Sequence, residues 1–143
     1  MAYIFHGKRE AMSVSQPNAA APDITAKTAE NAVLTKATLR AAELMDITAR
    51  TLASIIGVSE ATVSRMRRQE FLLERGTKPF ELAVLFVRLF RSLDAIVGGD
   101  EAIARAWLKN SNTAFDGSPL EKILTITGLV DVIAYLDSRR ALV

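Results

Sequence analysis

The chain has 143 residues, of which 50% are hydrophobic and 24% are charged, with a formal net charge of +2. That length allows one domain of ordinary size or two small ones that share a core, and the apolar content excludes global disorder. The absence of cysteine excludes disulfides, thiolate metal sites and a cysteine nucleophile. The longest uninterrupted apolar run, residues 82–87, is far shorter than the roughly 18 residues of a membrane span. No apolar segment of a secretory signal follows Lys8 and Arg9, so we predict a cytoplasmic protein with no membrane partner.

The charges are unevenly distributed along the chain. Residues 40–91 carry nine basic and six acidic side chains, whereas residues 92–143 carry five basic and seven acidic ones. A module that contacts phosphates needs a local positive excess. We therefore expect any nucleic-acid contact in the middle of the chain and a different partner for its C-terminal third.

Residues 1–25 are rich in Ala, Ser, Pro and Gln without a sustained period, and they predict a disordered N-terminal tail that contains the only histidine, His6. The remaining chain has a helical pattern. We predict helices over residues 29–45, 49–56, 60–70, 79–97, 100–109, 118–128 and 129–141. The predicted fold is all-α with about seven helices, in which an N-terminal half (26–78) packs on a C-terminal half (79–143).

Residues 48–68 meet the constraints of a helix-turn-helix motif. Ala53 falls where the first helix crosses the second and a larger side chain would separate them. Gly57 follows at the turn, where the chain needs a positive φ. Ser59 is a good N-cap for the next helix. Three apolar residues recur at inward-facing positions, Val58, Val63 and Met66. This combination predicts a DNA-binding helix pair.

The outward positions of this pair are the candidate DNA contacts, because the second helix of such a motif enters the major groove. Arg65 and Arg68 can contact guanine or a phosphate, and Arg67 is interpreted as a solvated side chain. The full candidate set is Thr48, Arg50, Ser59, Glu60, Ala61, Thr62, Ser64, Arg65 and Arg68. Many motifs of this type have Gln at the position of Ala49, where it contacts a phosphate, so its absence lowers the affinity that we expect for DNA.

The predicted helix over residues 79–97 is apolar around most of its circumference. Its four charged side chains, Glu81, Arg88, Arg91 and Asp94, fall within roughly 140° of the helical wheel. Such a helix needs cover on more than one side. Two interpretations stay open and are compatible with each other, a homodimer contact and a central core helix.

A specific order of landmarks follows in the last third of the chain. Trp107-Leu108 precedes a loop that ends in Ser118-Pro119-Leu120, and Gly128 precedes a closing helix. Together with the upstream helix-turn-helix, of the Xre/Cro-like type, this pattern resembles the Xre/MbcA/ParS antitoxins and their C-terminal toxin-binding domain. The resemblance covers roughly residues 30–143.

The resemblance implies a partner that periodicity cannot indicate. Antitoxins of this type pair with RES-domain toxins, enzymes that hydrolyse NAD or use it for ADP-ribosyl transfer. The C-terminal region covers the active-site cleft of the toxin, and the helix-turn-helix binds the promoter of its own operon. Carried onto this chain, the exposed candidates for toxin binding are Asn110, Asn112, Asp116, Lys122, Asp137, Arg139 and Arg140. Trp107, Leu108, Leu120 and Leu136 are interpreted as core, and residues 138–143 as a tail that could enter the cleft.

Other function classes find little support in the sequence. Acid–base or nucleophilic catalysis needs convergent titratable groups, and no Gly-rich phosphate loop or metal-ligand spacing is found. We therefore predict no enzymatic activity, no catalytic residues, no metal, no cofactor and no small-molecule substrate. The alternative to an antitoxin is a plain dimeric helix-turn-helix repressor without a toxin partner.

Overall fold

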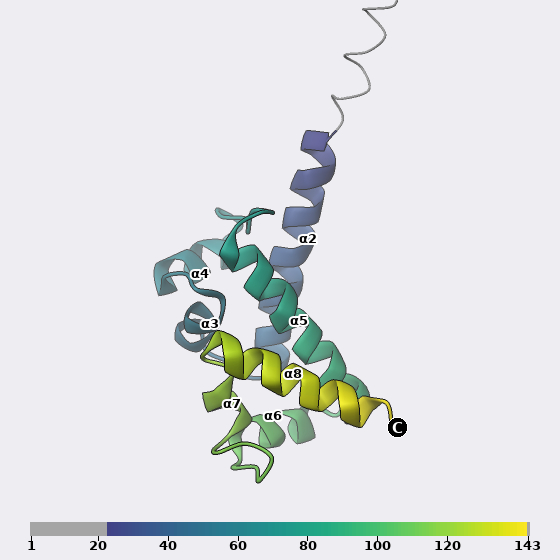
Figure 1. Ribbon diagram of the computed structural model, residues 1–143. Helices are drawn as coiled ribbons and strands as arrows, with labels where there is room; N and C mark the ends of the chain where they lie inside the picture. The colour runs from purple at the N-terminus through teal and green to yellow at the C-terminus, as the bar shows by residue number, and fades with distance from the viewer. Residues whose placement is uncertain (1–22, 143) are drawn as a thin grey trace, which may run out of the picture. The chain divides into compact units, whose positions relative to one another are not determined.

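The computed structural model describes residues 23–142, and in this range the regular secondary structure is helical (Figure 1). The helices are α2 (Asp23–Leu44), α3 (Ala49–Ile56), α4 (Glu60–Arg67), α5 (Lys78–Ile96), α6 (Glu101–Lys109), α7 (Pro119–Lys122) and α8 (Ile126–Arg140). The all-α prediction and the number of helices are confirmed for this part of the chain. None of these helices combines the length and apolarity needed to cross a membrane.

Most helices begin at a polar N-cap whose side chain accepts a hydrogen bond from a backbone N–H of the first turn. Such caps satisfy donors that have no partner within the helix. The capping residues are Thr48, Ser59, Thr77, Asp100, Ser118 and Thr125 for α3 to α8 in turn. Pro119 fits the first position of α7 because that position needs no N–H. Local chemistry therefore fixes the helix starts.

Several predicted boundaries are wrong, and the helix predicted over residues 118–128, for example, ends at Lys122. The first helix starts at Asp23 rather than at residue 29, because residues 25–30 are exposed and carry no apolar period that would reveal a helix. The predicted tail accordingly overlaps α2 over residues 23–25, and residues 1–22, including His6, lie outside the described residues. α4 ends at Arg67 rather than at residue 70, since Gln69 adopts a left-handed φ of 62°.

We predicted that a helix ends at Gly128, but this glycine lies in the first turn of α8. The helix is capped by Thr125, whose hydroxyl accepts a hydrogen bond from the Gly128 N–H at 3.1 Å. A Cβ at Gly128 would overlap the backbone carbonyl oxygen of Lys122. The glycine is required here because two backbone segments approach each other closely, not because the helix stops.

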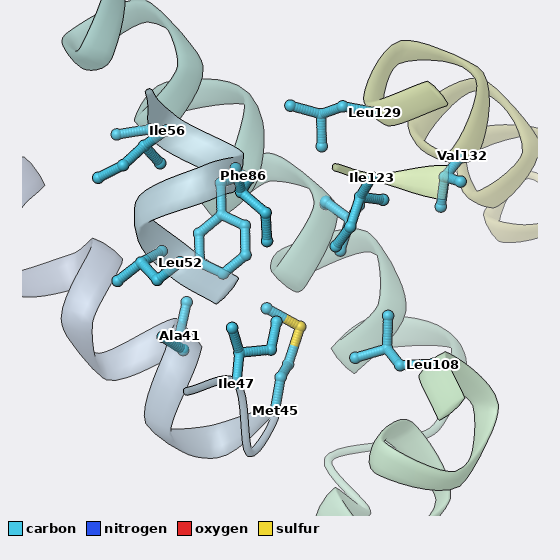
Figure 2. Packing of buried hydrophobic residues seen from close by; sticks show 14 of the residues in the cluster. Ala41, Met45, Ile47, Leu52, Ile56, Phe86, Leu108, Ile123, Leu129 and Val132 are labelled. Carbon is cyan, nitrogen blue, oxygen red and sulfur yellow. The ribbon is translucent and has the colours of Figure 1, made fainter. Parts of the chain in front are cut away.

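One hydrophobic cluster runs through the helix-turn-helix half and the C-terminal half. Figure 2 shows Phe86 of α5 beside Leu52 and Ile56 of α3, with Ile123, directly after α7, and Leu129 of α8 on the other side. These five side chains are almost completely buried. The two halves therefore share a core, as predicted.

α5 is the central helix of this core. It packs against α8 along much of its length and also contacts α3 and α6 (Figure 1). This packing explains the wide apolar surface that the sequence predicts for α5, so a dimer contact is not needed to account for it. Val84 is 44% exposed, whereas Leu82, Leu85 and Phe90 are half-buried against the core.

Polar contacts also join α6 to the C-terminal end of α2. Arg105 donates from Nε to the carbonyl oxygen of Leu44 at 3.0 Å, which satisfies an acceptor that α2 leaves open. Lys109 Nζ lies 2.8 Å from a carboxylate oxygen of Asp46, in the turn after α2. The hydrogen bond and the charge of Lys109 lower the pKa of Asp46. Both contacts connect the two halves of the chain at their surface.

Candidate functional site

The helix-turn-helix has the geometry that the sequence predicts. Gly57 adopts a φ of 74°, and its N–H donates to the carbonyl oxygen of Ala53 at 2.9 Å. Ala53 is 6% exposed, and Val63 and Met66 of α4 are 0% and 2% exposed. A buried small residue, a left-handed glycine and an inward-facing apolar pair hold α3 and α4 together. The crossing of α3 and α4 is therefore fixed by the core.

The outward side of α4 carries most of the predicted DNA contacts. Glu60, Ala61, Ser64, Arg65 and Arg68 fall within about 140° of the helical wheel. Glu60, Ala61, Arg65 and Arg68 are exposed, as are Thr48, Arg50 and Ser59 nearby in the chain, while Thr62 and Ser64 are half-buried. The structure therefore gathers two arginines and small polar residues on one helix face.

Two predicted contacts also cap helices. The Ser59 hydroxyl accepts from the Thr62 N–H at 3.1 Å and is bonded to the Thr62 hydroxyl at 2.9 Å. The Thr48 hydroxyl accepts from the Thr51 N–H at 3.2 Å. These hydroxyls primarily position the helices, so their part in any DNA contact is limited by the caps.

The two arginines on this face are held by residues that follow α4 and that sequence reasoning missed. The guanidinium carbon of Arg65 lies 5.1 Å from the ring centroid of Phe71. Arg68 Nε donates to a carboxylate oxygen of Glu70 at 3.1 Å. Arg67 instead borders a hollow with Asp46 and residues of α2, away from this face. Its interpretation as a solvated side chain agrees with its exposure.

In the C-terminal half, three half-buried aromatic side chains form a cluster. The Trp107 and Tyr135 rings are stacked, with centroids 6.3 Å apart and an interplanar angle of 17°. Phe115 meets both rings edge to face, at 6.2 Å from Trp107 and 5.1 Å from Tyr135. We call Trp107, Phe115 and Tyr135 the aromatic cluster. It joins α6, the following loop and α8.

The aromatic cluster lies between two surface hollows that share Tyr135. The first hollow is apolar apart from Arg139 and is lined by Leu93, Ile96, Val97, Trp107, Tyr135, Leu136, Arg139 and Leu142. The second has a mixed lining with three charged side chains and is lined by Ala114, Phe115, Asp116, Lys122, Gly128, Asp131 and Tyr135. Arg139 Nε donates to the Tyr135 hydroxyl at 3.2 Å, and its guanidinium carbon lies 5.3 Å from that ring's centroid.

Two family models match the chain and together cover most of it. Residues 25–88 match the antitoxin Xre-like helix-turn-helix domain, and residues 92–141 match the antitoxin Xre/MbcA/ParS C-terminal toxin-binding domain. This chain belongs to the Xre/MbcA/ParS-type antitoxins. The first matched segment ends and the second begins inside α5, with residues 89–91 between them. Antitoxins and helix-turn-helix regulators are generally not enzymes. A comparison with curated proteins found no match.

The structure places the predicted toxin contacts of this antitoxin in different settings. Asn110, Asp116, Arg139 and Arg140 are exposed, and Asp116 and Lys122 line the second of the two hollows. Asn112 is half-buried, and its side chain accepts from the Ala114 N–H at 2.9 Å, which shapes the loop. Val143, at the end of the predicted tail, lies outside the described residues, and α8 continues to Arg140.

Asp137 of the antitoxin, predicted as an exposed toxin contact, is bound within the chain. Its carboxylate lies 2.6 Å from Arg88 and accepts from the Ser92 hydroxyl at 2.9 Å, so it ties α8 to α5. The Ser92 hydrogen bond, followed by the hydrogen bond and charge of Arg88, lowers the pKa of Asp137 against the opposing effect of its desolvation. The main role of the Asp137 charge is therefore to stabilise the fold, and binding of a partner comes second.

We predict that Asp137→Asn reduces the acid sensitivity of the antitoxin. Because the folded-state pKa of Asp137 lies below the usual value of 3.8, its carboxylate stabilises the fold above that pH, and this stabilisation is lost as pH falls further. Urea unfolding at pH 7 should show the wild type to be more stable than Asp137→Asn. The difference between their free energies of unfolding should narrow at pH 3. Ser92→Ala should reproduce part of this narrowing. A gap of the same size at both pH values would contradict the prediction.

Proposed function

We propose that the antitoxin neutralises a RES-domain toxin that consumes NAD, and that it represses its own operon through the helix-turn-helix. The observation that carries the proposal is the toxin-binding domain matched over residues 92–141, directly after an antitoxin-type helix-turn-helix. A plain repressor has no use for a toxin-binding domain, so this match favours an antitoxin. The choice of a RES-domain toxin rests on the resemblance of the landmarks from Trp107 to Leu136. We place the antitoxin in the cytoplasm, where its DNA target lies.

The proposed toxin-binding face is the aromatic cluster with the charged residues around it. Trp, Tyr and Arg are the residues most enriched among those that dominate binding energy at protein interfaces. Trp107 and Tyr135 are half-buried, so each ring is fixed in the domain and still offers part of its surface. Arg139 beside them adds a cation that suits the polar cleft of an enzyme that binds a dinucleotide. Covering that cleft would exclude NAD.

The consumption of NAD by the purified toxin tests the proposed inhibition. The toxin to use is the RES-domain protein encoded beside the antitoxin gene, mixed with increasing amounts of the full antitoxin. We expect the loss of NAD to stop once the antitoxin saturates the toxin. NAD consumption that continues at full saturation, with a folded antitoxin, would overturn covering of the active site. An adjacent gene without a RES domain would overturn the choice of toxin.

For the DNA half, we propose a homodimer that presents two α4 helices to half-sites about one helical turn apart. The exposed arginines of α4 and the net positive charge of residues 40–91 support this role. The predicted contacts Thr48, Arg50 and Ser59 lie at or near helix N-termini, where backbone N–H groups favour phosphates. The operator is proposed to lie in the promoter of the antitoxin's own operon.

We predict that Arg65→Ala weakens binding to a duplex of this promoter region about five- to 150-fold, since one bidentate arginine–guanine pair contributes about 1–3 kcal/mol. Arg67→Ala is the matched control, because it removes the same charge from the other side of the same helix. Fluorescence anisotropy at a fixed salt concentration measures both affinities. Equal losses of DNA affinity in the two variants would show that only net charge matters. That result would contradict recognition of a base by Arg65.

A further inference from the structure

The end of α4 places an aromatic ring beside one of the arginines on the DNA-facing surface. After α4 the chain reverses at Gln69, and the Glu70 N–H donates to the carbonyl oxygen of Arg65 at 2.8 Å. This reversal brings Phe71 alongside the helix, with its ring centroid 5.1 Å from the guanidinium carbon of Arg65. Phe71 is half-buried and packs against the hydrophobic core. The ring is therefore a fixed support for the guanidinium group.

The two arginines of this face differ in how they are held. Arg68 is paired with the carboxylate of Glu70, which offsets its charge and repels a phosphate. Arg65 lies over a neutral ring, and in the described part of the chain no carboxylate pairs with it. A guanidinium group stacked on an aromatic ring keeps its planar set of N–H donors available. Arg65 thus combines an uncompensated charge with a restricted orientation.

We propose that Phe71 is a positioning residue that holds Arg65 for recognition of a guanine in the major groove of duplex DNA. Guanine presents O6 and N7 in that groove, and an arginine can bond both atoms at once only in one orientation. A phosphate accepts an arginine from many directions. Phe71 therefore acts on sequence preference at one base pair more than on overall affinity. The inference rests on the proposed binding of promoter DNA.

Selection from a pool of randomised duplexes tests this role and does not require a known operator sequence. The full chain is incubated with duplexes long enough for two half-sites, and the bound fraction is sequenced. The wild type is expected to enrich guanine at one fixed position of each half-site, and Arg65→Ala should lose that preference. Phe71→Leu keeps an apolar side chain but removes the π face. It should lower the guanine preference about two- to fivefold and leave the rest of the motif unchanged.

Two further variants separate positioning from a general structural effect. Phe71→Tyr retains the π face and should retain the guanine preference. Glu70→Gln releases Arg68 from its carboxylate and should raise affinity for all duplexes without changing the motif. An unchanged motif in Phe71→Leu, or a motif weakened equally at every position, would overturn the role of Phe71. If the folded wild type enriches no motif, the proposed binding to promoter DNA fails instead.

Discussion

Gly128→Ala is expected to destabilise the C-terminal half more than an added Cβ at any other glycine of the described residues. The new Cβ would overlap the carbonyl oxygen of Lys122, so α7 and α8 would have to separate. Overpacking of this kind costs about 3 kcal/mol, which is a large share of the stability of a domain this size. Thermal unfolding followed by circular dichroism should show a melting temperature lower by about 10 °C.

The neighbouring position supplies the control for this substitution. Thr127 lies in the same helical turn and is exposed, so Thr127→Ala adds no contact and improves helix propensity slightly. We expect its melting temperature to equal or exceed that of the wild type. A Gly128→Ala variant that melts with the wild type would show that the α7–α8 junction can relax, and the packing described here would then be wrong.

The second large effect is expected at the proposed toxin-binding face. Trp107→Ala removes the ring that stacks on Tyr135 and contacts Phe115, and with it the largest side chain of the aromatic cluster. Truncation of a central tryptophan at an interface commonly costs about 2 kcal/mol or more, so affinity for the toxin should fall about 30-fold or more. Titration calorimetry with the purified RES-domain toxin, well below the melting temperature, measures this loss.

Loss of fold and loss of contact have to be separated in that experiment. Arg139→Glu changes an exposed side chain and leaves the core intact, and it should weaken toxin binding in the same direction. Val33→Ala, at a position 68% exposed on α2, is the control in the other half and should bind as the wild type does. Wild-type affinity in both Trp107→Ala and Arg139→Glu would place the toxin contact elsewhere on the chain.

Much of the fold could be predicted from the sequence because its determinants are local. Ser59, Asp100 and Ser118 cap helices wherever an apolar period follows them, and each begins a helix as predicted. The predicted start of α8 is wrong although Thr125 offers the same kind of cap, because the glycine at position 128 favours a helix end. A glycine at this point of the sequence is typical of a helix end. The glycine is needed at position 128 because the backbone of Lys122 lies close to it, and only folding brings the two together.

The candidate sites likewise include features with a local signal in the sequence and features that only the folded chain reveals. The outward face of α4 follows from a period of about 3.6 residues and from the buried pair Val63 and Met66. Phe71 could not be assigned to Arg65, because the reversal depends on a left-handed residue, Gln69, that is not glycine. Asp137 has the sequence signature of a surface charge, and only the packing of α8 on α5 reveals its bonds to Arg88 and Ser92.

Tyr135 shows what the sequence could have indicated. It precedes Arg139 by one helical turn, a spacing at which side chains meet, and the pair is in contact in the structure. Its stacking on Trp107 joins residues of two different helices and had no local signal. The sequence thus predicts the two-part organisation and the candidate surfaces, while the contacts that orient individual side chains require the fold.

The central claim is that toxin neutralisation and DNA binding reside in separate parts of one antitoxin. Growth of cells that express the adjacent RES-domain toxin together with wild type, Arg65→Ala or Trp107→Ala antitoxin, at matched protein levels, tests it most directly. We predict that wild type and Arg65→Ala restore growth and that Trp107→Ala does not. Growth arrest with Arg65→Ala, or full rescue by Trp107→Ala, would contradict the separation, and arrest with the wild type would contradict neutralisation itself.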